Sequence, residues 1–171
     1  MSQPKSPNLM KAEYLDGYRL HLCWRHHGED IVDLAPWIAS TPALRLTFQD
    51  GALFKQAHVD EDGWSVAWND RIELDAEHLF RLARYQTGES LEPESFHAWR
   101  IRHGLNQTQA AQALGITQRM VRYYEHGHYL VPKTITLACK SLDAMLPCNM
   151  DHPTNRPETL NPLTPAGTPP P

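Results

Sequence analysis

The chain has 171 residues and carries 16 Lys and Arg against 20 Asp and Glu, which gives a formal net charge of −4. This length suits one large domain or two small ones. The slightly acidic balance argues against the strongly basic class of proteins that bind nucleic acid without sequence preference.

The sequence also argues against secretion and membrane insertion. No apolar run reaches the length of about 18 residues that a membrane span needs, and residues 1–8 lack the apolar core of a secretory signal. The chain has three cysteines, Cys23, Cys139 and Cys148, and none of them forms a C-x-x-C pair. An odd and scattered set of this kind is typical of reduced thiols. We therefore expect a cytoplasmic protein that does not contact a membrane.

The first half of the chain alternates short apolar runs with turn residues. Leu20, Leu22 and Trp24 alternate with polar residues, and this period of two is typical of a half-buried strand. Asx-Gly pairs adopt the positive φ angles that tight hairpins need. The predicted turns and adjoining strands are Asp16-Gly17 between 10–15 and 18–24, Asp50-Gly51 between 44–48 and 52–59, Asp62-Gly63 before 64–68, and Asn69-Asp70 before 71–74.

A helix is predicted after these strands. Asp75 is a suitable N-cap, and Leu79, Phe80 and Leu82 recur at helical spacing, which predicts a helix over 76–85. The predicted fold class is α+β, with residues 1–88 forming a small, mainly antiparallel sheet covered by one or two helices. Residues 148–171 are rich in proline and should form a flexible tail.

Residues 93–127 have the pattern of three short helices. The helices are expected over 93–103, 107–114 and 118–125, bounded by the capping or turn residues Gly104, Asn106, Gly115, Thr117 and Gly127. In the third helix Val121 and Tyr124 should point inward, which leaves four side chains outward: Gln118, Arg119, Arg122 and Tyr123. Such a helix can enter the major groove of DNA.

The run Gly-Leu-Asn-Gln-x-x-x-Ala-x-x-Leu-Gly-Ile-Thr-Gln, followed by Tyr-Glu-x-Gly and Pro132, closely resembles the Cro-like phage-repressor family of helix-turn-helix domains. The resemblance implies an all-α domain over 89–147, with a further helix over 134–146. It implies a partly buried ion pair between Arg100 and Glu125. It also implies DNA contacts: Gln107 would bind a phosphate, and His126 and His128 would lie near phosphates. Base edges would be faced by Thr117, Gln118, Arg119 and Tyr123, while Arg122, at the edge of that face, would reach bases or backbone.

The N-terminal half resembles a small bacterial α+β domain family. The resemblance rests on Val32-Asp33-Leu34-Ala35-Pro36, a Leu–Phe pair of strands within 46–54, the turn at Trp68-Asn69-Asp70, and the helix start at Asp75–Leu79. It implies a domain that occurs alone or joined to a repressor-like helix-turn-helix, with a link to antitoxins in some members. It assigns no activity.

One cluster of residues could support catalysis or bind a metal: His21, Cys23, His26 and His27. No second cluster completes a tetrahedral ligand set at a familiar spacing. We therefore expect solvated turn residues, no metal, no cofactor and no enzymatic activity.

The sequence thus predicts a sequence-specific DNA-binding protein, a transcriptional regulator of the repressor type. We expect it to bind double-stranded DNA as a homodimer, while the α+β domain mediates dimerisation or binds a toxin or effector. The alternative is an antitoxin or adaptor whose helix-turn-helix contacts protein instead of DNA.

Overall fold

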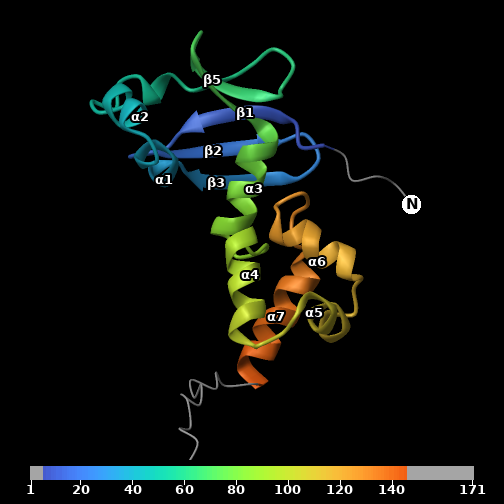
Figure 1. The fold of residues 1–171 in the computed structure, drawn as a ribbon. Coiled ribbons are helices and arrows are strands. Elements are labelled where there is room, and N and C mark those ends of the chain that lie inside the picture. The colour runs from blue at the N-terminus through green and yellow to red at the C-terminus, as the bar shows by residue number, and fades with distance from the viewer. Residues whose placement is uncertain (1–5, 146–171) are drawn as a thin grey trace, which may run out of the picture.

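The computed structural model describes residues 6–145, which form an α+β part above a bundle of helices (Figure 1). The predicted α+β class is confirmed. The strands are β1 (Leu9–Tyr14), β2 (Arg19–Trp24), β3 (Gly28–Asp33), β4 (His58–Val59), β5 (Ser65–Asn69) and β6 (Ile72–Asp75). The helices are α1 (Ala35–Ala39), α2 (Pro42–Thr47), the 3-10 helix η1 (Phe54–Gln56), α3 (Ala76–Gln86), α4 (Pro93–Arg102), α5 (Gln107–Leu114), α6 (Gln118–Glu125) and α7 (Lys133–Met145).

The first sheet is a meander in which β2 pairs antiparallel with both β1 and β3. The predicted hairpin at Asp16-Gly17 is confirmed, because Gly17 has a positive φ of 50° and the N–H of Arg19 donates to the Asp16 carbonyl at 2.8 Å. The alternation predicted for β2 is also confirmed, since Leu20, Leu22 and Trp24 are buried. One face of this sheet therefore belongs to the core, and the other carries polar side chains.

The second sheet, β4-β5-β6, uses the predicted turns at Asp62-Gly63 and Asn69-Asp70. Gly63 lies against β1: its carbonyl accepts a hydrogen bond from the N–H of Leu9 at 2.8 Å, and a Cβ at Gly63 would lie 2.4 Å from the Leu9 carbonyl oxygen. The absence of a side chain at this position lets the two sheets approach each other. The strands thus form two sheets where the sequence predicted one.

The strands predicted on both sides of Asp50-Gly51 are wrong, apart from the short β4, and so is the strand pair within 46–54. Thr41 caps α2, because its hydroxyl accepts a hydrogen bond from the N–H of Leu44 at 3.3 Å, and Pro42 lies in the first helical turn. A capping threonine followed by proline favours a helix start. These local signals outweigh the Asp50-Gly51 turn signal, from which strands were predicted on both sides.

The helix predicted after Asp75 is confirmed as α3, and it covers the first sheet (Figure 1). The Asp75 side chain accepts a hydrogen bond from a helix N–H at 2.7 Å. Leu79 and Ala83 are fully buried, and α3 packs on β3. Arg84 forms an ion pair with Asp30 of β3, which fixes the helix on the sheet.

The C-terminal helices have their own core. α5 and α6 have the predicted bounds, α4 ends one residue before the predicted end, and α7 begins one residue before the predicted start. The buried residues of this core are not shared with the first core: Phe96, Trp99, Ala110, Ala111, Leu114, Val121, Tyr124, Val131 and Cys139.

Three contacts join the two parts of the chain around α3. Arg81 Nη1 donates to the Gly127 carbonyl at 2.7 Å, directly after α6. Lys140 of α7 donates to the Gly88 carbonyl at 3.1 Å, and Glu89 pairs both with Lys133 at 2.9 Å and with Arg84 of α3 at 2.5 Å. Between the two parts, α3 and α4 follow one another down the length of the molecule (Figure 1).

The predicted tail over 148–171, and Leu146 of the predicted last helix, lie outside the described residues. Within residues 6–145, no helix combines the length and the apolar character needed to cross a membrane.

Candidate nucleic-acid interface

Local chemistry sets the connection between α5 and α6. Asn106 and Gln109 form a reciprocal cap, in which each side-chain oxygen accepts the other residue's N–H at 2.9 Å. Gly115 ends α5 with a φ of 66°, a left-handed conformation that strains other residues. The Thr117 hydroxyl then caps α6 by accepting from the N–H of Met120 at 3.3 Å. These residues fix where α5 ends and where α6 begins.

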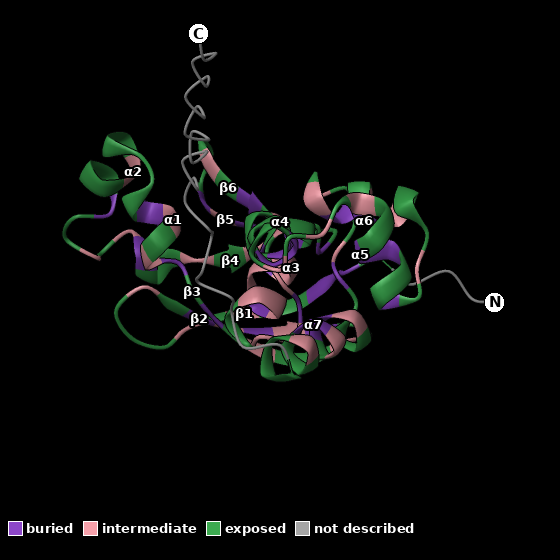
Figure 2. Cartoon of the chain, turned by 60° about the horizontal axis from the view of Figure 1, so that its bottom comes forward, coloured by how far each residue is buried: buried purple, intermediate pink, exposed green. Residues whose placement is uncertain are grey.

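α6 has one buried face and one exposed face (Figure 2). Val121 is completely buried and Tyr124 is 4% exposed, so both pack into the core of the helical part. Gln118, Arg119 and Arg122 lie on the opposite face and are exposed. The helix therefore offers an amide and two guanidinium groups to a molecule outside the protein.

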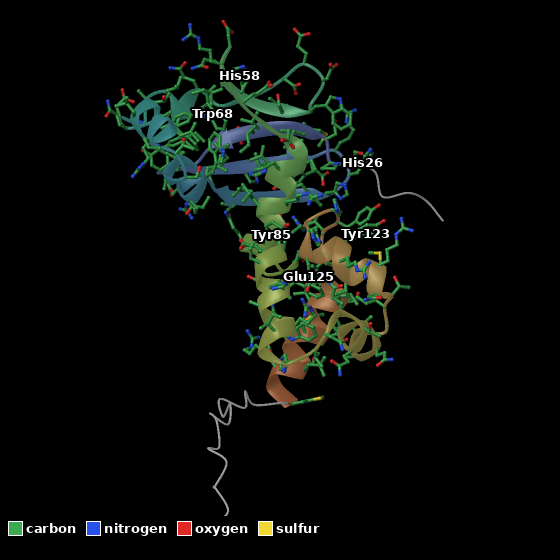
Figure 3. All side chains as sticks on the ribbon, in the orientation of Figure 1. His26, His58, Trp68, Tyr85, Tyr123 and Glu125 are labelled. Carbon is green, nitrogen blue, oxygen red and sulfur yellow. The ribbon has the colours of Figure 1, made fainter. Side chains whose placement is uncertain are left out.

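The ion pair between Arg100 and Glu125 is present and ties α4 to α6. Arg100 Nε donates to Glu125 Oε1 at 2.5 Å, and the two side chains are 10% and 5% exposed. Arg100 also donates to the Leu105 carbonyl at 2.9 Å, and Gln107 donates to the second carboxylate oxygen at 2.8 Å. In Figure 3, Glu125 lies among the helices, whereas Tyr123 lies on the outer side.

This network determines the charge of Glu125. Burial alone raises the pKa of a carboxyl group, but the hydrogen bonds from Arg100 and Gln107 and the positive charge of Arg100 outweigh burial, so the pKa of Glu125 lies below its ordinary value. Glu125 is therefore an anion whose charge is neutralised inside the protein. It adds little repulsion toward a polyanion that approaches α6.

Gln107 is engaged by the protein on both sides of its amide group. Its Nε2 donates to Glu125, and its Oε1 accepts from Arg122 Nε at 3.1 Å. The structure therefore places the residue expected to bind a phosphate between α5 and α6, as part of the same network. Arg122 is held at the edge of the exposed face by this bond.

Arg119 lies along Tyr123, one turn further on the same helix. Its Nε donates to the Tyr123 hydroxyl at 2.5 Å, and its guanidinium carbon lies 5.1 Å from the centre of the tyrosine ring. Cation–π contacts of this kind orient an exposed arginine without burying it. The remaining N–H groups of Arg119 still face outward, because the residue is exposed.

The two histidines after α6 stand next to this pair. His126 and His128 stack with ring centres 6.1 Å apart, and His128 packs edge-on against Tyr123 at 5.5 Å. Tyr129, 56% exposed, also packs on Tyr123 at 5.3 Å. Tyr129 could not be predicted as part of this surface, because it follows the helix end and belongs to no periodic pattern. These rings form a surface at the C-terminal end of α6.

The structure thus brings seven of the eight predicted DNA-contacting residues to the outer side or the ends of α6: Thr117, Gln118, Arg119, Arg122, Tyr123, His126 and His128. The eighth, Gln107, begins α5 and contacts Arg122. This geometry, two short helices joined by a glycine turn with the second one exposed, defines a helix-turn-helix.

Comparisons with known proteins agree with that description. The helix-turn-helix family model of the Cro/C1 type matches residues 96–138. The chain is also similar to the crystal structure of "Putative DNA Binding Protein NE0471" from Nitrosomonas europaea ATCC 19718, with 32% identity and a TM-score of 0.51 over 95% of this chain and 100% of that one. No curated protein is similar enough to count as a match. The chain therefore belongs to the family of the Nitrosomonas protein.

Proposed function

We propose that this protein binds double-stranded DNA in a sequence-specific manner and acts as a transcriptional regulator of the repressor type. The proposal rests above all on one observation: α6 exposes Gln118, Arg119 and Arg122, while its opposite face is buried. An α-helix fits the major groove, where such side chains meet the base edges. The family likeness to a protein named for DNA binding supports the same function.

The chemistry of the exposed residues supports base recognition. Glutamine pairs well with adenine and arginine with guanine, and each good pair contributes about 1–3 kcal/mol of discrimination. The Thr117 hydroxyl accepts a helix N–H and keeps its own proton to donate outward. His126 and His128 follow α6, where they would approach the phosphates at the end of the helix.

We further infer that the protein acts as a homodimer. One helix-turn-helix reads a short half-site with modest affinity, and a two-fold dimer reads two half-sites about 34 Å apart. Because the two hydrophobic cores share no buried residue, residues 1–88 and 89–147 can serve as separate domains. The first domain would then provide dimerisation or bind a toxin or effector.

Selection from random-sequence duplexes tests the proposal directly. The full chain should enrich a palindromic motif whose half-sites lie one helical turn apart. An antitoxin or adaptor that uses its helix-turn-helix on protein would enrich no motif above the background. A motif without two-fold symmetry would leave DNA binding in place but contradict the homodimer.

A further inference from the structure

Two strands of the first sheet, β2 and β3, bring a histidine, a cysteine and a glutamate together on the solvent-facing side. His21 and Cys23 alternate on β2 with the buried Leu20, Leu22 and Trp24, so they point away from the core. Pairing with β3 places Glu29 directly opposite Cys23. His21 and Cys23 could be recognised as neighbours in the sequence, whereas Glu29 comes next to them only through the pairing of β2 with β3.

The ligand atoms of these residues have the spacing of a metal site. Glu29 Oε2 lies 3.1 Å from His21 Nε2, and Glu29 Oε1 lies 3.7 Å from Cys23 Sγ. One such atom from each residue lies within 4.8 Å of the others. Nitrogen, sulfur and oxygen atoms bound tetrahedrally to Zn²⁺ at about 2.0–2.3 Å lie about 3.3–3.5 Å apart. The two Glu29 distances involve its two different oxygens, so side-chain rotations that bring one oxygen, the His21 nitrogen and the Cys23 sulfur from within 4.8 Å to this spacing would complete the geometry.

A second carboxylate, that of Glu13, lies near the other ring nitrogen of His21. Glu13 lies opposite His21 on β1, and its Oε2 is 3.9 Å from His21 Nδ1. Histidine ligands commonly donate their other N–H to a carboxylate, which fixes the tautomer and orients the ring. Glu13 also pairs with Lys11 at 2.7 Å, so the one lysine opposite Cys23 is already neutralised.

We propose that His21, Cys23 and Glu29 bind one Zn²⁺ ion, with Glu13 orienting His21 and water completing the coordination. A thiolate, an imidazole and a carboxylate form a ligand set that suits zinc. Binding replaces the thiol proton of Cys23, which passes to solvent. The site joins all three strands of the sheet, and it does not depend on DNA binding at α6.

Cobalt(II) provides the test, because it takes the zinc geometry and is coloured. The reduced full chain, freed of metal with a chelator, should bind one Co²⁺ and show a thiolate-to-cobalt absorption band that Zn²⁺ abolishes. Cys23→Ser should remove the band. Glu13→Gln should weaken Co²⁺ binding about 10- to 100-fold, and His21→Ala and Glu29→Gln should weaken it more.

Matched controls exclude other thiols and histidines. Cys148→Ser and His58→Ala, which changes an exposed residue of the second sheet (Figure 3), should bind Co²⁺ like the unchanged chain. Burial raises the pKa of Cys139 to about 12, so this thiol is a poor competing ligand. Circular dichroism verifies that each variant folds. A missing band, or a band that survives in Cys23→Ser, would overturn the proposal.

Discussion

Replacing Glu125 by alanine should destabilise the helical part of the protein strongly. The carboxylate is 5% exposed and accepts hydrogen bonds from Arg100 and Gln107, while the Arg100 side chain is 10% exposed. Removing one partner of such a pair leaves a buried charge without its counterion, at a cost of about 3–5 kcal/mol. Because Arg100 keeps its bond to the Leu105 carbonyl, we expect the lower end of that range.

Urea denaturation followed by circular dichroism measures this loss, and an exposed arginine of α4, the helix that carries Arg100, provides the control. Arg102 pairs with Asp143 at 2.7 Å, but the two side chains are 43% and 38% exposed. Arg102→Ala should therefore cost no more than about 1 kcal/mol. If Glu125→Ala and Arg102→Ala shifted the denaturation midpoint equally, the pair with Arg100 would not stabilise the fold as a buried pair does.

The same pair predicts how stability depends on pH. Although burial raises the pKa of Glu125, its hydrogen bonds to Arg100 and Gln107 hold it below the ordinary value, so the folded protein binds this proton more weakly than the unfolded chain. The contribution of the pair is therefore complete above the ordinary glutamate pKa of about 4.3 and is lost as the pH falls below it. The difference in unfolding free energy between the unchanged chain and Glu125→Ala should shrink progressively as the pH falls below that ordinary value. A constant difference would contradict the assignment.

The remaining predictions concern α6, its ends and the tail. Arg119→Ala should relax base preference at one position, by about 1–3 kcal/mol in binding, whereas Gln107→Ala should weaken all duplexes similarly; equal, sequence-independent losses in a binding assay would refute these roles. The double variant His126→Ala, His128→Ala should weaken binding to all duplexes similarly in fluorescence anisotropy, because contacts near phosphates carry no sequence information, and a loss confined to one duplex sequence would contradict that role. Removing 148–171, outside the described residues, should leave the melting temperature unchanged because proline-rich sequence buries little apolar surface, and a drop of several degrees would show that the segment packs on the fold.

The helix-turn-helix was predictable because its determinants are local. Asn106, Gly115 and Thr117 act on the backbone within a few residues, and α5 and α6 have the predicted bounds. The same kind of signal, Thr41 with Pro42, was present at α2, but the prediction there followed the Asp50-Gly51 turn and placed strands on both sides of it. In this short run the structure follows the cap and not the turn signal.

The sequence by itself determined which residues begin and end each helix of the DNA-binding motif, and which side chains of α6 face outward. Only the tertiary structure decided that Gln107 bridges Glu125 and Arg122, and that Glu29 joins His21 and Cys23. The physical reason is the range of the forces involved. Caps and glycine conformations act on backbone within one turn of the same residue. Strand pairing and a buried ion pair instead join residues that no local sequence pattern connects.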